Sequence, residues 1–350
     1  MNFSKNFKIG RKEIGKDKPA YIIAEIGSNH NQNLNLAIEM IERAADAGAN
    51  AVKFQSILFN QLYQKEYESR KFHNWFKSIE LNEEWYPILI KEAKKNNLEF
   101  LSSPTYTGAI DLFNQYKLKA IKIASPQFQG DHEIVKKAAV TGKPLILSTG
   151  YALEKEIKFI KDLCFKYKNR KLVFLHCVSK YPTIYKESNL IFINKLKELT
   201  GCLVGFSDHS QGYHLPIAAV TLGACIIEKH VTKNRNSKGP DHHFAMHFNE
   251  FKEMVLRIRE VESAFGYSKK NSLPKIVKNY KNNIIKKAFS NKFIKKNEII
   301  ENKKLKWLRC SKKGIDRNMN FFANKKIIAN KNIEPNTLIT VKDIIKNKSK

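Results

Sequence analysis

Residues 202–231 read CLVGFSDHSQGYHLPIAAVTLGACIIEKHV, and this stretch contains one complete unit of the fold. An apolar, β-branched run (202–209) is followed by a segment with helical periodicity (214–224) and then by a second apolar run (225–231). A strand–helix–strand order of this kind is typical of parallel sheets whose strands are joined by helices. Both runs also carry polar and charged residues at their carboxyl-terminal ends.

The same alternation recurs along the first 267 residues, where eight apolar runs each precede a longer segment. Eight such units within about 250 residues match the number and length of a TIM (β/α)8 barrel. A doubly wound open sheet is the alternative, but no G-x-G-x-x-G motif follows the first run. We therefore predict an α/β protein with a TIM barrel. The runs are 21–26, 51–56, 98–103, 120–125, 144–149, 172–179, 202–209 and 225–231.

The composition changes after residue 267. Residues 268–283 are rich in Lys, Asn, Ser and Pro with little periodicity, which indicates a linker. Residues 284–350 contain short β-type runs and two similar turn phrases, IKKNEII (294–300) and IEPNTLI (333–339). The predicted organisation is a barrel over residues 1–267, a linker over 268–283 and a small, mostly β domain over 284–350.

The chain has 63 Lys and Arg residues against 33 Asp and Glu, a formal net charge of +30. The excess is scattered lysine without a zinc-finger or RNP-type signature, which favours a solvated basic surface over nucleic-acid binding. No run of 18 apolar residues and no apolar leader appear, so we expect no membrane span and no secretory signal. The five cysteines form no CxxC pair, which favours reduced thiols in the cytoplasm.

Polar residues gather at the carboxyl-terminal ends of all eight runs. In a TIM barrel these ends form the catalytic face, and a buried strand that ends in Lys or His is otherwise costly. We therefore expect these side chains to meet at one mouth of the barrel. They are Glu25, Lys53, Gln55, Ser103, Lys122, Ser125, Ser148, His176, Ser179, Ser207, His209, Glu228 and His230.

Two kinds of chemistry are indicated at this mouth. His209 and His230 end neighbouring runs, and two neutral imidazoles with open positions beside them form a plausible divalent metal site. The alternative is that either histidine is a hydrogen-bonded core residue. Lysines and hydroxyls that converge on one mouth suit a phosphate or carboxylate ligand. Those residues are Lys53, Ser103, Lys122, Ser125, Ser148 and Ser207.

Several motifs, in order across residues 20–266, resemble the sialic acid synthase family. The tail after residue 284 resembles the antifreeze-like (SAF) domain that follows the barrel in this family. The motifs are IIAEIGSNHN (22–31), AGANAVKFQ (47–55), LSSP (101–104), IKIAS (121–125), LILSTG (145–150), LHCVSKYP (175–182), GFSDHS (205–210), EKHVT (228–232) and GPDHHFAM (239–246).

The resemblance implies a reaction and a set of roles. Phosphoenolpyruvate would condense with an N-acetylated amino sugar, either N-acetylmannosamine or a diacetamido-dideoxyhexose of the pseudaminic or legionaminic type. The product would be a nine-carbon 2-keto sugar acid, with release of phosphate. The implied metal, Mn²⁺ or Mg²⁺, would bind His209 and His230. Phosphoenolpyruvate would bind the six lysines and serines named above, and Glu25, Gln55, Tyr181 and Asp241 would meet the sugar or the reacting centre.

The resemblance also implies a domain-swapped homodimer, in which Arg309 reaches the partner's sugar site. Two departures bear on these roles. Gln127 stands where relatives carry Glu, and an amide cannot act as a general acid or base. Proton transfer would then fall to Glu25, Asp241 or metal-bound water, so we place Glu25, Gln127 and Asp241 in the catalytic group. In the tail, IKKAFS and LRCSKKGI replace an Arg-Arg-Ser start and an Arg-Pro-Gly turn.

Two other functions remain as alternatives. A metal-dependent hydrolase on the same barrel would need a carboxylate that bridges two metals or a third histidine ligand, and it leaves Lys53 and Lys122 unexplained. A basic nucleic-acid-binding protein would explain the charge but not the polar strand ends. Of the histidines near residue 240, we expect His242 and His243 to line the sugar pocket or cap the barrel, and His247 to begin the last helix.

Overall fold

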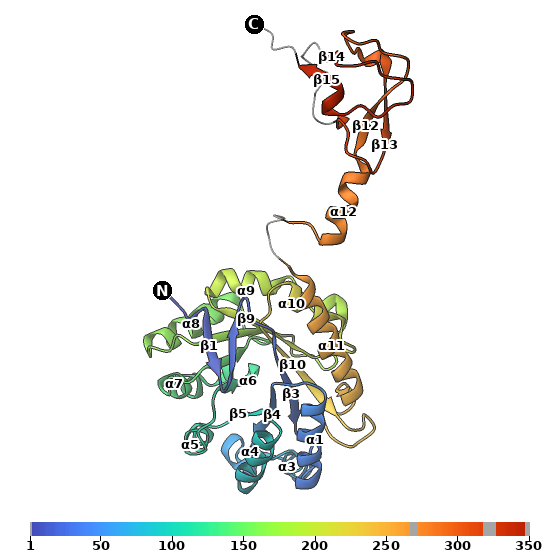
Figure 1. Cartoon of the computed structure of the whole chain (residues 1–350). Helices are drawn as coiled ribbons and strands as arrows, with labels where there is room; N and C mark the ends of the chain where they lie inside the picture. Colours follow the sequence, from blue (N-terminus) through green and yellow to red (C-terminus); the bar gives the residue numbers. More distant parts are fainter. Residues whose placement is uncertain (1, 267–271, 318–326, 347–350) are drawn as a thin grey trace. The chain divides into compact units, whose positions relative to one another are not determined.

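The computed structural model describes residues 2–266, 272–317 and 327–346 (Figure 1). The chain divides into two compact units, Met1–Gly266 and Tyr267–Lys350. The first unit carries the predicted barrel, and the second carries the predicted small β region. Each unit is described separately below.

Eight parallel strands form the barrel, in the order β5-β4-β3-β10-β9-β8-β7-β6. The two end strands, β5 and β6, are also neighbours in space, so the barrel is nearly closed. All eight predicted runs are strands, and the predicted TIM-like barrel is confirmed. The strands are β3 (Tyr21–Gly27), β4 (Ala51–Ser56), β5 (Glu99–Pro104), β6 (Ile121–Ile123), β7 (Leu145–Ser148), β8 (Leu172–His176), β9 (Leu203–Asp208) and β10 (Ile226–Thr232), with β11 (Met246–His247) paired to the end of β10.

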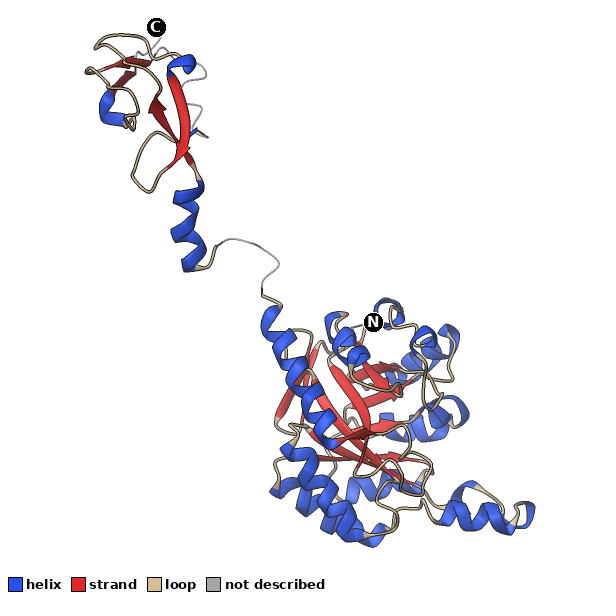
Figure 2. Cartoon of the chain, turned by 90° about the vertical axis from the view of Figure 1, so that its right-hand side faces the viewer, coloured by secondary structure: helices blue, strands red, loops and turns tan. Residues whose placement is uncertain are grey.

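Helices surround the strands and cover their outer faces (Figure 2). Helix α1 shows why they form: Asn33 caps its first turn by accepting a hydrogen bond from the Leu36 backbone, and Met40 and Ile41 lie on its buried face. None of the helices in the described ranges has the length and apolar character needed to cross a membrane. The barrel helices are α1 (Leu34–Asp46), α2 (Phe59–Leu62), α3 (Arg70–Lys77), α4 (Tyr86–Lys95), α5 (Gly108–Gln115), α6 (Ser125–Gly130), α7 (His132–Val140), α8 (Glu154–Lys166), α9 (Phe192–Thr200), α10 (His214–Thr221) and α11 (Phe248–Ala264).

An amino-terminal hairpin that the sequence patterns did not predict lies against one end of the barrel. Its strands, β1 (Asn6–Ile9) and β2 (Lys12–Gly15), pair antiparallel. Phe7, Ile9 and Ile14 are buried in one cluster with side chains from the amino-terminal halves of the barrel strands, including Ile23 and Leu101. The hairpin therefore covers the apolar end of the barrel interior that lies opposite the strand tips.

The second unit begins with a helix and continues as paired short strands. Helix α12 (Lys275–Ile284) occupies much of the predicted linker over residues 268–283. Residues 268–271 lie outside the described residues. The strands are β12 (Lys286–Ser290), β13 (Leu305–Arg309), β14 (Ile327–Ala329) and β15 (Ile344–Lys346), paired as β12–β13 and β14–β15.

The two similar turn phrases of the second unit pair with each other. Ile294 and Ile333, which begin the phrases, exchange backbone hydrogen bonds of 3.0 and 2.9 Å. Asn297 and Asn336 occupy the same position in their phrases, and both have a positive φ, of 65° and 64°. Asparagine tolerates this left-handed conformation better than most residues. The likeness of this unit to an SAF domain remains a prediction.

Candidate active site

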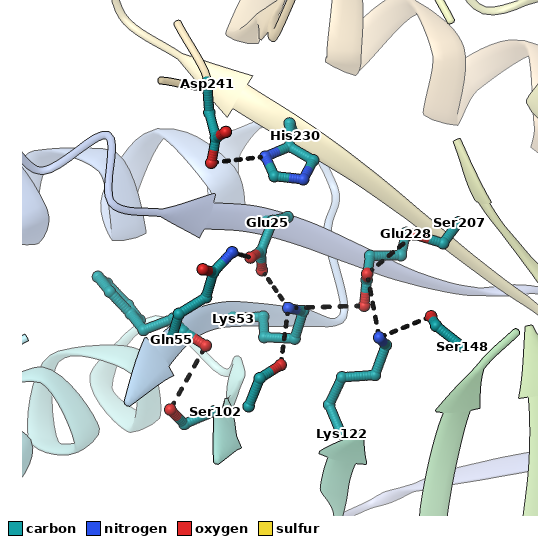
Figure 3. Close-up of polar contacts among 12 residues, drawn as sticks. Glu25, Lys53, Gln55, Ser102, Lys122, Ser148, Ser207, Glu228, His230 and Asp241 are labelled. Atoms are coloured by element: carbon teal, nitrogen blue, oxygen red, sulfur yellow. Dashed lines mark hydrogen bonds and ion pairs between the residues drawn. The ribbon is translucent and has the colours of Figure 1, made fainter. Parts of the chain in front are cut away.

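The carboxyl-terminal ends of β3, β4, β6, β7 and β10 bring two lysines and two glutamates together inside the barrel (Figure 3). The Lys53 ammonium lies 2.8 Å from a Glu25 carboxylate oxygen and 4.0 Å from Glu228. The Lys122 ammonium lies 3.6 Å from Glu228 and donates a 2.7 Å hydrogen bond to the Ser148 hydroxyl. All five side chains are buried. The predicted convergence of Lys53 and Lys122 is therefore present in the structure.

Hydroxyl groups surround this lysine–carboxylate cluster, as predicted. Lys53 donates a 3.1 Å hydrogen bond to Ser103, and Ser207 donates one of 3.0 Å to Glu228. Ser125 lies within hydrogen-bonding distance of the Cys177 thiol, at 3.2 Å, and its hydroxyl accepts a 3.0 Å hydrogen bond from the Gly150 backbone.

Gly150 has to lack a side chain at this point. A Cβ there would lie 2.2 Å from the Ser179 hydroxyl and 2.9 Å from both Cys177 and Ser125. The absence of a side chain lets the backbone N–H approach Ser125 closely enough to bond it. A backbone donor and a hydroxyl are thus held together beside the cluster.

Burial and mutual charge set the protonation of the cluster. Burial raises the pKa of Glu25. Burial would also raise the pKa of Glu228, but Lys122 and Lys53 together hold it below its usual range. Burial would lower the pKa of Lys53, but Glu228 and Glu25 raise it, whereas burial prevails at Lys122 and lowers its pKa. We conclude that Lys53 and Glu228 are charged and that Glu25 can take up a proton more readily than an exposed glutamate.

His209 and His230 face each other, with ring centroids 5.5 Å apart. The Nδ1 of His209 donates a 2.8 Å hydrogen bond to the Val178 carbonyl, which leaves its Nε2 as a lone-pair donor. The Nδ1 of His230 is buried without a hydrogen-bond partner in the described residues, and it lies 3.5 Å from a carboxylate oxygen of Asp241. Burial lowers the pKa of His209 to about 4 and that of His230 well below its ordinary value. Both rings are therefore neutral near pH 7, the form that binds metals.

The charges at the mouth also suit a bound cation. Lys53 and Lys122 face Glu25, Glu228 and Asp241, and with all five ionised these groups carry a net charge of −1. Burial raises the pKa of Asp241 to about 7, so this carboxyl is partly protonated at neutral pH. A divalent cation would reverse the sign of the site and favour an anionic ligand. The residues present therefore fit a metal ion held by His209 and His230.

The described residues contain no group of three or more His, Cys, Asp or Glu side chains arranged to hold a metal. A metal at the two histidines would complete its coordination with solvent or substrate. The hydrolase alternative required a third histidine or a bridging carboxylate, and the arrangement does not favour it.

The residues predicted to meet a sugar lie beside the histidines and the lysine–carboxylate cluster. Gln55 donates a 2.8 Å hydrogen bond to Glu25, and Asp241 contacts His230 as described above. The Tyr181 ring packs against His209, with ring centroids 4.2 Å apart and an interplanar angle of 42°, and 44% of the Tyr181 surface is exposed. A partly exposed aromatic ring thus lies beside both histidines.

The remaining two predicted residues are Gln127 and Arg309. Gln127 lies on α6, half-buried, and lines a cavity of about 380 Å³ with Gln61, Thr105 and neighbouring residues. Arg309 ends β13 in the second unit and is exposed. The roles assigned to Gln127 and Arg309, and the domain-swapped homodimer, remain predictions.

The other histidines are accounted for by local structure. His242 is buried, and its ring nitrogens lie 2.7 Å from the Thr232 hydroxyl and 3.0 Å from the Asn31 carboxamide oxygen, so it fastens the loop after β10. His243 is exposed, and His247 is the N-cap residue of α11, as predicted. His176 contacts the Ser188 carbonyl at 2.8 Å, which indicates a structural role.

Three residues near the site were missed or undervalued in the sequence. In the sequence, Glu228 is recognisable only as one of the polar residues at the ends of the apolar runs, yet its carboxylate joins Lys53 to Lys122. Lys229 and Asp208 form a buried ion pair of 2.5 Å between β10 and β9. Lys229 also donates to the Ser210 carbonyl, and Asp208 accepts from the Ser210 N–H at 2.9 Å. The ion pair therefore fixes the backbone on both sides of His209.

We expect Lys229→Met to lower the free energy of unfolding by about 3–5 kcal/mol, because it leaves the buried Asp208 carboxylate without its cation. Urea denaturation followed by circular dichroism measures this difference. Lys233→Met is the matched control: Lys233 is close in sequence, but its ion pair with Glu39 is exposed, and its loss should cost less than about 1 kcal/mol. Equal effects of the two substitutions would contradict the prediction.

Buried lysines, carboxylates and neutral imidazoles lie at the carboxyl ends of the strands of this TIM-type barrel, which is where enzymes of this fold class have their active sites. Comparison with known proteins identifies the family. Residues 40–270 match the NeuB family, and the chain belongs to this family. The resemblance to sialic acid synthases stated above is thereby confirmed.

Two relatives and one solved structure give the level of similarity. The N,N'-diacetyllegionaminic acid synthase of Campylobacter jejuni is 38% identical over 81% of this chain and 88% of its own length. A pseudaminic acid synthase of the same organism is 35% identical over 84% of this chain and 88% of its own length. The crystal structure of N-acetylneuraminic acid (sialic acid) synthetase from Leptospira borgpetersenii, in complex with citrate, is 32% identical and superposes with a TM-score of 0.73, covering 80% of this chain and 96% of that one.

Proposed function

We propose that this protein condenses phosphoenolpyruvate with an N-acetylated amino sugar to give a nine-carbon 2-keto sugar acid and phosphate. The observation that carries the proposal is the pair of buried ammonium groups, Lys53 and Lys122, surrounded by hydroxyls and placed next to two neutral histidines. The names of the relatives support the same class of product. The acceptor that we propose is N-acetylmannosamine or a diacetamido-dideoxyhexose.

The lysines and serines suit the first substrate because phosphoenolpyruvate carries a phosphate and a carboxylate on three carbons. Lys53 and Lys122 supply point charges, and Ser103, Ser148 and Ser207 supply hydroxyl groups. Ser103 and Ser148 now accept hydrogen bonds from the lysines, and Ser207 donates one to Glu228. Charge-assisted hydrogen bonds of this kind are stronger than those between neutral groups. Binding both substrates in one mouth also gives the effective concentration that a bimolecular reaction otherwise lacks.

In the proposed reaction, C3 of phosphoenolpyruvate forms a bond to the aldehyde carbon of the open-chain sugar, and the aldehyde oxygen gains a proton. Water then adds to C2, and phosphate leaves as the C2 keto group forms. A divalent ion, when bound, supplies Lewis acidity to the aldehyde oxygen. Glu25 and Asp241, whose pKa values burial raises, are the carboxyl groups placed to give or accept these protons. Gln127 can only hydrogen-bond to the substrate.

The test is phosphate release from phosphoenolpyruvate by the full-length protein with added Mn²⁺ or Mg²⁺. N-Acetylmannosamine and a panel of diacetamido-dideoxyhexoses serve as acceptors, and mass spectrometry identifies the product. We expect phosphate release that depends on one of these sugars. The mass of the product should equal the sum of the masses of that sugar and pyruvic acid. Absence of sugar-dependent release with every acceptor would refute the proposed function.

A further inference from the structure

A cavity of about 940 Å³ lies at the amino-terminal ends of β4, β5 and β6, away from the strand tips that form the candidate active site. Three parts of the chain border it: the turn of the β1–β2 hairpin, the ends of α4 and α5, and the residues that lead into the three strands. Its volume lies in the range of small-molecule sites. Nothing in the proposed synthase reaction uses this cavity.

The cavity is lined by an excess of positive charge. Six of its fifteen lining residues are Lys or Arg, against 63 of 350 in the whole chain. Glu99 is the one carboxylate among them, and it lies against the hairpin turn: a Cβ at Gly10, where φ is +57°, would be 1.6 Å from a Glu99 oxygen. The six basic residues are Lys8, Arg11, Lys12, Lys94, Lys117 and Lys119.

Within the part of the chain that the structure describes, these six side chains form no ion pair and no hydrogen bond. Neighbouring lysines differ: Lys95, next to Lys94, lies 2.9 Å from Glu92, and Lys137 lies 2.5 Å from Asp111. Helix ends account for two of the six: Lys94 lies in the last turn of α4, and Lys117 follows α5, and a cation at these places complements the helix dipole. Lys8 stands opposite Glu13 in the hairpin register. Arg11, Lys12 and Lys119 have no carboxylate partner within the described residues, and three such cations around one cavity favour an anionic ligand with several charges.

The other lining residues indicate a second feature of the ligand. Tyr116 is half-buried, and one face of its ring stacks on Tyr86, with centroids 5.8 Å apart and an interplanar angle of 17°. Ile90 and Leu118 extend this apolar wall, and Asn50 and Asn97 contribute carboxamide groups. The wall suits a flat apolar group, and amides can read the donors and acceptors on its edge.

From this combination we propose that the cavity binds a nucleoside di- or triphosphate, with its phosphates at the lysines and its base at the Tyr116 wall. Such a ligand would join the hairpin to the barrel, because Lys8, Arg11 and Lys12 come from the hairpin whereas Lys117 and Lys119 come from the segment between α5 and β6. Binding to the folded state alone would raise the midpoint of thermal unfolding.

The test measures binding of ATP, CTP, inorganic tripolyphosphate and inorganic phosphate to the full-length protein, by isothermal titration calorimetry and thermal unfolding at low ionic strength. The variant Lys117→Glu/Lys119→Glu is expected to weaken nucleotide binding at least tenfold, with phosphoenolpyruvate-dependent turnover unchanged. The matched control is Lys91→Glu/Lys158→Glu, which makes the same change in net charge at two exposed lysines outside the cavity. The control should bind like the unaltered protein.

A second variant tests whether the nucleobase binds at the Tyr116 wall. Tyr116→Leu should weaken ATP or CTP binding several-fold and leave tripolyphosphate binding unchanged. The proposal is overturned if no probe binds, or if the cavity variant and the control lose affinity equally, since the net charge of +30 would then explain the binding. Equal losses of nucleotide and tripolyphosphate affinity in Tyr116→Leu would overturn the assignment of a nucleotide.

Discussion

Replacement of His230 by alanine is expected to lower metal-dependent phosphate release by about a thousandfold or more, because it removes one of two neutral imidazoles that can hold the metal. Lewis-acid activation of a carbonyl contributes several kcal/mol, and each 1.4 kcal/mol corresponds to a factor of ten. The fold should persist, since the Nδ1 of His230 forms no hydrogen bond within the described residues, and its 3.5 Å contact with Asp241 is no ion pair while burial keeps the pKa of His230 low and the ring neutral. Initial rates with saturating sugar and Mn²⁺ measure the effect.

A readout that does not depend on turnover separates loss of the metal from other damage. Mn²⁺ titration followed by electron paramagnetic resonance should show the loss of one bound ion per chain in His230→Ala. His243→Ala is the matched control, because His243 lies on the loop after β10 but is exposed. It should keep both Mn²⁺ binding and turnover. If His230→Ala bound Mn²⁺ as tightly as the unaltered protein, the metal site would have to lie elsewhere.

The barrel could be predicted because its signal is repeated eight times. Each strand is apolar along its length and polar at one end, as in β10, where Ile226 and Ile227 precede Glu228 and His230. The hairpin gives no such signal: its strands have four residues each, and only Phe7, Ile9 and Ile14 alternate. Whether so short an alternation forms a hairpin depends on the barrel end that it covers, which is a tertiary property.

The difference between a local sequence pattern and a tertiary contact also explains why Lys229 was not predicted near the candidate active site. Side chains alternate across a strand, so Glu228 and His230 point to one side of β10 and Lys229 to the other. A lysine is ordinarily expected to reach solvent. A lysine that points outward from a barrel strand instead enters the layer between the strands and the surrounding helices. Lys229 is buried there because Asp208 occupies the register position opposite it on β9. That pairing requires the strand register, which the separate runs do not contain.

Replacement of Lys122 by methionine is expected to lower kcat/KM for phosphoenolpyruvate by about 10²–10⁴-fold. Removing one partner of a buried, hydrogen-bonded charge pair costs about 3–5 kcal/mol, and bound phosphoenolpyruvate, with its phosphate and carboxylate, would lose the same cation. The single substitution has two consequences, however. It removes a cation from the proposed ligand site, and it leaves the buried Glu228 carboxylate with Lys53 alone, 4.0 Å away.

The double variant Lys122→Met/Glu228→Gln separates these two consequences, because it removes the cation and the carboxylate charge together. We expect the single variant to lose both stability and affinity for phosphoenolpyruvate, and the double variant to regain stability, measured by urea denaturation, without regaining affinity. Lys122→Arg should retain part of the affinity, since it keeps the charge but changes the donor geometry around Ser148. Recovery of the Michaelis constant for phosphoenolpyruvate in the double variant would show that Lys122 acts only by neutralising Glu228. In that case Lys53 would be the cation that binds the substrate, and the two-lysine site would have to be reduced to one.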